Sequence, residues 1–173
     1  MRETALMLEI SRAASDSFDE VVRQRESQVL RSAYRMLGNW ADAEDAAQEV
    51  FLRLYRHGMN FRDEAALGAW LYRVLFNLCV DRARVARPAA EMPELQAREP
   101  AADSTLLREE QKQRLTAALA QLPARERAAI VLREIEGLST DDVAAILGSS
   151  EGTVRSQVSR ALTRLRSLMK GER

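Results

Sequence analysis

Basic and hydroxyl side chains gather near the C-terminal end of the chain, in "SSEGTVRSQVSRALTRLRSLMK", residues 149–170. This stretch holds five basic residues and one acidic residue. Its apolar residues recur at helical spacing and, at 100° per residue, share one arc of about 120°. The rest of the helix surface carries Arg155, Ser156, Ser159, Arg160, Thr163 and Arg164. Cations interleaved with hydrogen-bonding side chains indicate an acidic partner such as a nucleic acid.

The charge of the whole chain does not reveal this surface, because 26 basic and 26 acidic side chains cancel. Residues 104–173 carry a net charge of +3, and residues 88–103 carry −3. A local field of this kind can attract phosphate. Charge alone is also compatible with an ordinary solvated helix face, so the neighbouring residues have to decide.

The residues before the basic helix, "LSTDDVAAILGSSEGTV", have the pattern of two helices that meet at a tight turn. Ser139 and Asp142 predict a capped helix start, Gly148 predicts its end, and Ser150 can cap the next helix. A helix-turn-helix needs a small residue, a turn glycine and a core anchor, which here are Ala144, Gly148 and Val154. We therefore predict a DNA-binding helix-turn-helix whose second helix is the recognition helix.

Two further helices are expected upstream of this pair. In "LPARERAAIVLREIEG", Pro123 suits the first position of a supporting helix, and apolar residues follow at helical spacing. Residues 106–122 predict one more helix. Together these segments form a small C-terminal helical unit.

In the N-terminal half, "ADAEDAAQEVFLRLYRH" predicts a helix with a core stripe. Its far side aligns Asp45, Gln48, Glu49, Leu52 and Arg56. A solvated helix gains nothing from a leucine among acids, so this surface favours a basic protein partner. One exposed leucine is also common on protein surfaces and by itself means little.

The following helix lies within "NFRDEAALGAWLYRVLFNLCVDRARVAR" and aligns Arg73, Asn77 and Arg84 on one face. Aromatic rings beside arginines can serve single-stranded nucleic acid, because bases stack on rings while cations follow phosphates. For Trp70, Tyr72 and Phe76, packing in the core is the more frequent role. The helix alone does not decide between these interpretations.

Composition predicts an all-α fold of two small helical domains, because glycine and proline are scarce and no run alternates over strand lengths. Three of the four prolines lie in the acidic stretch 88–103. We expect an N-terminal domain at 13–87, a flexible linker at 88–104 and a C-terminal domain at 105–173.

The sequence lacks the residues that metal binding, enzymatic catalysis and membrane insertion require. One cysteine and one histidine leave no plausible metal-ligand set, and no cofactor is expected. The sequence shows no nucleophile with a matching base and no glycine-rich phosphate loop, which argues against an enzyme. Apolar runs are too short for membrane insertion, and "MRETALMLEISR" lacks the core of a secretion signal, so we expect a cytoplasmic protein.

The segments quoted above, in this order and spacing, resemble an extracytoplasmic-function (ECF) sigma factor of bacterial RNA polymerase. The resemblance implies a region-two domain that binds the clamp coiled coil of core RNA polymerase through Asp45, Gln48, Glu49 and Leu52. It implies a region-four domain that binds the duplex −35 promoter element and the polymerase flap. The sixteen residues 88–103 reach at most about 55 Å, whereas the two promoter elements lie near 70 Å apart, so free protein should bind promoters poorly.

The resemblance also implies which residues contact promoter DNA. The single-stranded −10 element would meet Asn60, Phe61, Arg62, Arg73, Asn77 and Arg84. The −35 element would meet Arg155, Ser156, Gln157, Ser159, Arg160 and Arg164. Many relatives carry arginine at the position of Gln157, which we place at the border of the buried stripe, within reach of an adenine edge. The alternative is that Gln157 only packs on the backbone.

Two questions stay open from the sequence. A stand-alone helix-turn-helix regulator that binds duplex DNA without polymerase is the main alternative, although it leaves residues 39–87 unexplained. Members of the family often have an anti-sigma factor, which makes one a candidate partner here. Nothing in the sequence identifies its contact surface.

Overall fold

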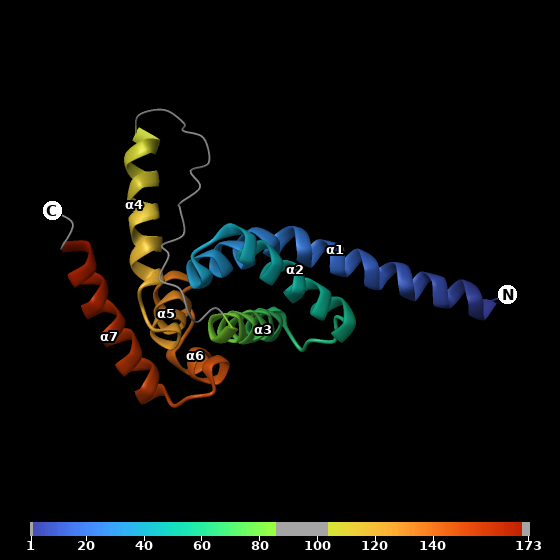
Figure 1. The fold of residues 1–173 in the computed structure, drawn as a ribbon. Coiled ribbons are helices and arrows are strands. Elements are labelled where there is room, and N and C mark those ends of the chain that lie inside the picture. The colour runs from blue at the N-terminus through green and yellow to red at the C-terminus, as the bar shows by residue number, and fades with distance from the viewer. Residues whose placement is uncertain (1, 86–103, 171–173) are drawn as a thin grey trace.

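The structure, a computed structural model, describes the backbone of residues 2–85 and 104–170 and the side chains of residues 17–82 and 110–170. Within these ranges every regular element is a helix, which confirms the predicted all-α fold (Figure 1). The N-terminal unit contains α1 (Arg2–Leu37), α2 (Trp40–His57) and α3 (Glu64–Val85). The C-terminal unit contains α4 (Ser104–Ala120), α5 (Ala124–Ile130), η1 (Val131–Ile135), α6 (Thr140–Leu147) and α7 (Glu151–Lys170).

Helix α1 is the element that the sequence analysis did not anticipate. It runs for 36 residues without a break at residue 13, where we expected the first domain to begin. Val29, Ala33 and Met36 are buried against the rest of the unit, at the spacing of one helix face. Gly38, with φ at +85°, ends α1 in a conformation that favours glycine. Asn39 then caps α2 by accepting a 2.8 Å hydrogen bond from the amide of Asp42.

The helix that supports the helix-turn-helix differs in detail from the prediction. Pro123 precedes α5 as its cap residue rather than occupying the first helical position. After Ile130 the chain widens into η1, a single π-helical turn, before it leaves the helix at Glu136. Such turns re-aim the side chains that follow them and are often found at functional sites.

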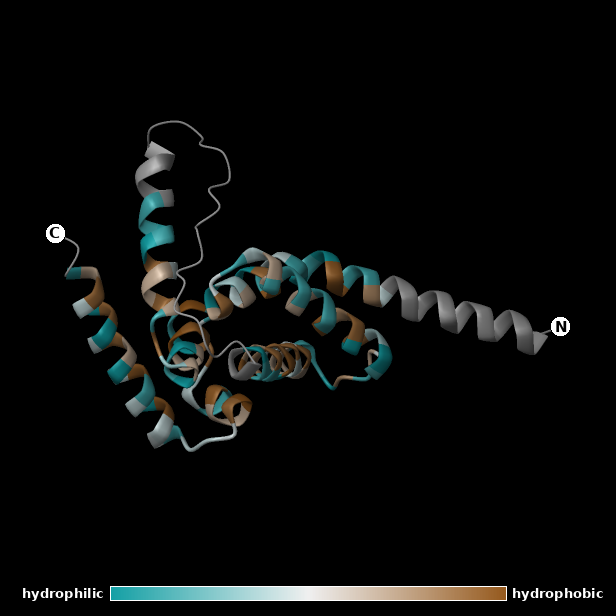
Figure 2. Ribbon diagram, in the orientation of Figure 1, coloured by the Kyte–Doolittle hydropathy of each residue, from teal (hydrophilic) through white to brown (hydrophobic). Residues whose placement is uncertain are grey.

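The two units pack directly on each other. Helix α3 lies against α6, and α1 lies against α4, α5 and η1. Their buried apolar side chains form one continuous cluster, and Figure 2 shows hydrophobic residues along α3, α5 and α6. Of the expected linker, 88–104, the described residues include only Ser104, which begins α4.

Candidate nucleic-acid interface

The predicted helix-turn-helix is confirmed at each of its local signals. The Ser139 hydroxyl caps α6 by accepting a 3.1 Å hydrogen bond from the amide of Asp142. Gly148 ends α6 in the left-handed conformation, with φ 59° and ψ 46°. Ser150 caps α7 by accepting a 3.2 Å hydrogen bond from the amide of Thr153. Val154 anchors the pair as a fully buried side chain.

The first turns of α7 present polar side chains to solvent. Arg155, Ser156 and Ser159 are exposed, and Arg155 forms an ion pair with Glu151 one turn earlier. A groove of about 440 Å³ runs along this flank, with Val158 and Leu162 among its lining residues. Arg133 and Arg166 also line it, two cations that the sequence analysis did not assign to DNA. Arg133 comes from η1 and Arg166 from α7, and the sequence pattern did not place these two residues on one groove.

On the opposite flank, Arg160 and Arg164 are tied to α5. The carboxylate of Glu126 lies 3.5 Å from Nε of Arg160 and 3.2 Å from Nε of Arg164. The glutamate side chain is 9% exposed, whereas the arginines are 60% and 55% exposed. Both guanidinium groups therefore keep open surface for a phosphate while one side is held by the protein.

Gln157 is buried, contrary to the expectation from the sequence. Its side chain is 6% exposed, so the expectation that it reaches a base edge from the border of the stripe is not supported. Gln157 shares a helix side with Arg160 and Arg164, and α5 packs over that side. Among the described residues its amide oxygen has no hydrogen-bond partner. Gln157, which the apolar pattern placed at the border of the stripe, thus lies on the buried side of α7.

In the N-terminal unit, the residues predicted for the −10 element begin in the loop before α3. Asn60 and Arg62 are exposed, and Phe61 stacks on His57 with ring centroids 5.1 Å apart. Trp70 packs against both rings, at 4.9 Å from His57 and 5.7 Å from Phe61. His57 and Trp70 complete an aromatic platform of which the sequence analysis assigned only Phe61 to DNA.

Asp63 in this loop has a structural role. Its carboxylate accepts a 2.8 Å hydrogen bond from the amide of Ala66 in the first turn of α3. That backbone hydrogen bond, followed by the hydrogen bond from Arg62, lowers the pKa of the Asp63 carboxyl. The cap therefore stays ionised at neutral pH and fixes where the loop enters α3.

Arg73 and Asn77 lie farther along α3, about 13 and 20 Å from the start of this helix at 1.5 Å per residue. Both are exposed, but Arg73 also donates a 2.7 Å hydrogen bond to the carbonyl oxygen of Ala145 in α6. They line a groove of about 640 Å³ whose other wall is the end of α6 with Gly148. Phe76 and Tyr72 are buried, as the core interpretation predicted. The side chain of Arg84 lies outside the described residues.

The acidic face of α2 is present with its leucine exposed. Leu52 is 44% exposed, and the Asp45 side chain is 70% exposed. Glu49 is half-buried and pairs with Arg53 at 2.8 Å. Gln48 and Leu52 also border a groove of about 600 Å³ between α1 and α2. The exposed ring of Tyr55 and the partly buried ring of Phe18 extend this apolar edge, which the sequence analysis missed because it did not anticipate α1.

The described residues hold neither a candidate metal site nor a helix that could span a membrane. No group of three or more histidine, cysteine, aspartate or glutamate side chains in the described part of the chain could hold a metal ion. No described helix is long and apolar enough to cross a membrane.

Comparisons with known proteins assign the family. Residues 21–88 match the family description "Sigma-70 region 2", and residues 112–165 match "Sigma-70, region 4". The ECF RNA polymerase sigma factor SigM of Mycobacterium tuberculosis is 37% identical over 153 residues, which cover 88% of this chain and 77% of that protein. This chain is an ECF sigma factor. It therefore belongs to the non-enzymatic factors that direct RNA polymerase in transcription initiation.

Further relatives agree with this assignment. The ECF RNA polymerase sigma factor SigE of Mycolicibacterium smegmatis is 42% identical over 165 residues, which cover 91% of this sigma factor and 63% of the relative's length. Among solved structures, the sigma factor RpoE in complex with the anti-sigma factor NepR from Bartonella quintana is 26% identical with a TM-score of 0.71. That alignment covers 91% of this chain and 99% of the RpoE chain, so it includes both helical units.

Proposed function

We propose that this sigma factor binds core RNA polymerase with α2 and reads two promoter elements, one with each helical unit. The observation that carries the proposal is the start of α7, where the Gly148 turn presents exposed Arg155, Ser156 and Ser159. The N-terminal end of the second helix is the part that enters the major groove in this motif. Duplex DNA at the −35 element is the ligand that fits it.

Within the −35 surface, different side chains have different roles. Arg155, Ser156 and Ser159 face outward and are proposed to contact base edges and the adjacent backbone. Arg160 and Arg164, which Glu126 holds on one side, are proposed to contact phosphates. Gln157 is left as a packing residue because it is buried.

The −10 element is proposed to bind as a single strand along α3. Phe61 with His57 and Trp70 offers stacking surfaces, and Arg73 with Asn77 offers a cation and an amide farther along the same helix. Unstacked bases need such a platform together with a cationic track for the backbone. By resemblance, Asn60, Arg62 and Arg84 extend the surface at its two ends.

The acidic face of α2 is proposed to bind the polymerase clamp coiled coil. Leu52 supplies an apolar contact, and Asp45, Gln48 and Glu49 supply polar and charged contacts for a basic partner. The C-terminal unit is proposed to contact the polymerase flap. Action in the cytoplasm follows from this partner. An anti-sigma factor is a further proposed partner, supported by the RpoE–NepR complex among the similar structures.

Run-off transcription tests the proposal. Purified sigma factor is added to core RNA polymerase on a library of genomic promoter fragments, and the transcript starts are mapped. Specific starts that share two upstream elements support it. A chain that binds duplex DNA but neither co-purifies with core polymerase nor directs transcription would instead be the stand-alone helix-turn-helix regulator.

A further inference from the structure

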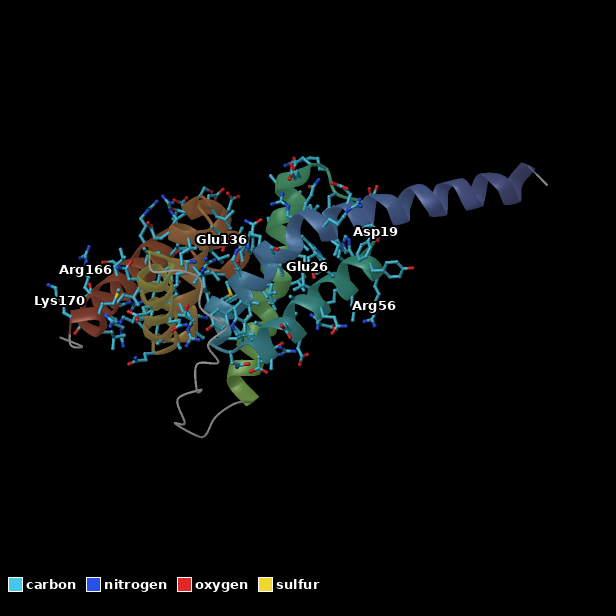
Figure 3. The ribbon with its side chains drawn as sticks, turned by 90° about the horizontal axis from the view of Figure 1, so that it is seen from above. Asp19, Glu26, Arg56, Glu136, Arg166 and Lys170 are labelled. Carbon is cyan, nitrogen blue, oxygen red and sulfur yellow. The ribbon has the colours of Figure 1, made fainter. Side chains whose placement is uncertain are left out.

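One buried carboxylate joins the two units. Glu136, the residue that follows η1, has a side chain that is only 5% exposed and lies where the C-terminal unit meets α1 (Figure 3). Its Oε1 accepts a 2.6 Å hydrogen bond from the Ser32 hydroxyl and pairs with Arg35 at 3.2 Å. Its Oε2 accepts hydrogen bonds from Gln28 at 3.1 Å and from the Tyr72 hydroxyl at 2.8 Å.

All four donors belong to the N-terminal unit, three on α1 and one on α3. Burial, together with the hydrogen bond to Glu136, raises the pKa of the Tyr72 phenol, so the hydroxyl stays protonated and able to donate. The Ser32 side chain is fully buried in this contact. A carboxylate with two oxygens is matched here by a complete set of donors, which makes the contact specific to this arrangement of the units.

Two more hydrogen bonds cross the same boundary. Arg127 of α5 donates to the carbonyl oxygen of Met36 at 2.5 Å, next to the end of α1. Arg73 of α3 donates to the carbonyl oxygen of Ala145 in α6 at 2.7 Å. The second bond uses a side chain that the proposed function assigns to the −10 element.

This arrangement is incompatible with simultaneous contact to both promoter elements. The elements lie about two helical turns apart, near 70 Å at 34 to 36 Å per turn. Arg73 is hydrogen-bonded to α6, an eight-residue helix about 12 Å long that leads directly into α7. The proposed −10 and −35 surfaces are therefore adjacent, and the units have to separate before both can be occupied.

We propose that Glu136 is the latch of a closed, self-inhibited form, in which the C-terminal unit docks on α1 and α3 and holds the −10 surface against the helix-turn-helix. The inhibition of promoter and polymerase binding rests on the proposed function, whereas the docking of the two units through Glu136 does not. Opening transfers Glu136 and its donors to water, and a binding partner that fits only the open form has to supply that free energy.

Small-angle X-ray scattering of the free, full-length chain tests the latch. Glu136→Gln removes the charge and places an amide opposite donors, whereas Glu134→Gln removes an equal charge from an exposed position two residues away. We expect Glu136→Gln to raise the radius of gyration by roughly a fifth, while wild type and Glu134→Gln stay compact. Unchanged helical circular dichroism shows that the units remain folded.

A second variant approaches the latch from the other unit. Ser32→Ala with Tyr72→Phe removes two of the four donors and leaves Glu136 in place. It is expected to expand the chain in the same direction, and it decides the test if Glu136→Gln does not fold. An extended wild type, or compact folded variants, would overturn the latch.

The inhibitory consequence has its own readout. Opened variants are expected to bind core RNA polymerase roughly tenfold more tightly than wild type, because they do not pay for opening. An expanded variant with unchanged affinity would overturn self-inhibition. Failure of wild type to bind polymerase would instead contradict the proposed function, and the scattering result would stand by itself.

Discussion

Arg164 of α7 lies 3.2 Å from the carboxylate of Glu126 on α5, and Arg160 lies 3.5 Å from the same group. One nearly buried anion thus holds two cations of the recognition helix. The Glu126 oxygen nearest Arg164 makes no hydrogen bond within the described residues, so the attraction is mainly between charges. In the proposed −35 complex, DNA phosphate would compete with Glu126 for both arginines.

Replacing Glu126 with glutamine should therefore strengthen sequence-independent DNA binding. We expect roughly fivefold tighter binding to a random duplex at low salt, with a steeper salt dependence, because both cations become available. Fluorescence anisotropy over a salt series measures this effect. Asp19→Asn, at an exposed position on α1, is the control for net charge, and an equal gain in that variant would contradict a specific role of Glu126.

Polymerase binding should depend on the exposed face of α2. Leu52→Asp and Asp45→Arg are expected to abolish co-purification with core polymerase while the helical circular dichroism stays intact, since both side chains are exposed. Arg31→Glu is the matched control, because it lies on α1 opposite the residues that border the α1–α2 groove. Wild-type retention by both α2 variants would refute this interface.

Strand opening should depend on Arg73 and Asn77 of α3. Arg73→Ala and Asn77→Ala are expected to reduce open-complex formation more on closed duplex than on a template melted at the −10 element. On closed duplex, contacts to the unstacked bases supply part of the free energy of melting, whereas the melted template does not need it. Permanganate footprinting on the two templates gives the comparison. Equal loss on both would indicate a defect in folding or in polymerase binding.

Gln157 should be replaceable without a change in promoter preference. Its amide oxygen is buried without a hydrogen-bond partner among the described residues, so Gln157→Met should raise the free energy of unfolding by about 1 kcal/mol. Denaturant titration measures the stability, and transcription from randomised promoters gives the −35 profile. A shift toward guanine in Gln157→Arg would reinstate the base contact that the sequence suggested.

Cys79 should resist thiol reagents in the native state. Burial raises the pKa of its thiol from 9.0 to about 12, against the opposing influence of Arg82 and Arg127. The neutral thiol thus stabilises the fold fully below about pH 9, and this contribution is lost as the pH rises toward 12. At pH 8 we expect labelling by a disulfide reagent roughly a thousandfold slower than in denaturant. Similar rates in both conditions would contradict the burial.

The sequence predicted best where a signal is local. Helix starts are capped by Ser139 and Ser150, and α6 ends at Gly148. Each of these roles involves only residues nearby in the sequence, so it could be predicted without the fold. The exposure of Leu52 followed from the period of a single helix in the same way. The family resemblance added the partners, which no periodicity contains.

Features that need a second element were not predictable. The sequence pattern placed Gln157 at a border, and only the packing of α5 decided that this border is buried. Helix α1 was missed, and with it the apolar edge that Phe18 adds beside Leu52.

Helical periodicity and capping by themselves determined the all-α fold, the helix-turn-helix and its basic face, because these depend on neighbours in sequence. Only the tertiary structure decided that Glu126 holds Arg160 and Arg164, and that Glu136 meets four donors from the other unit. Glu136 lies 104 residues from Ser32 and 64 from Tyr72. The sequence around a carboxylate does not indicate its distant hydrogen-bond donors, because the positions of whole helices decide which donors reach it.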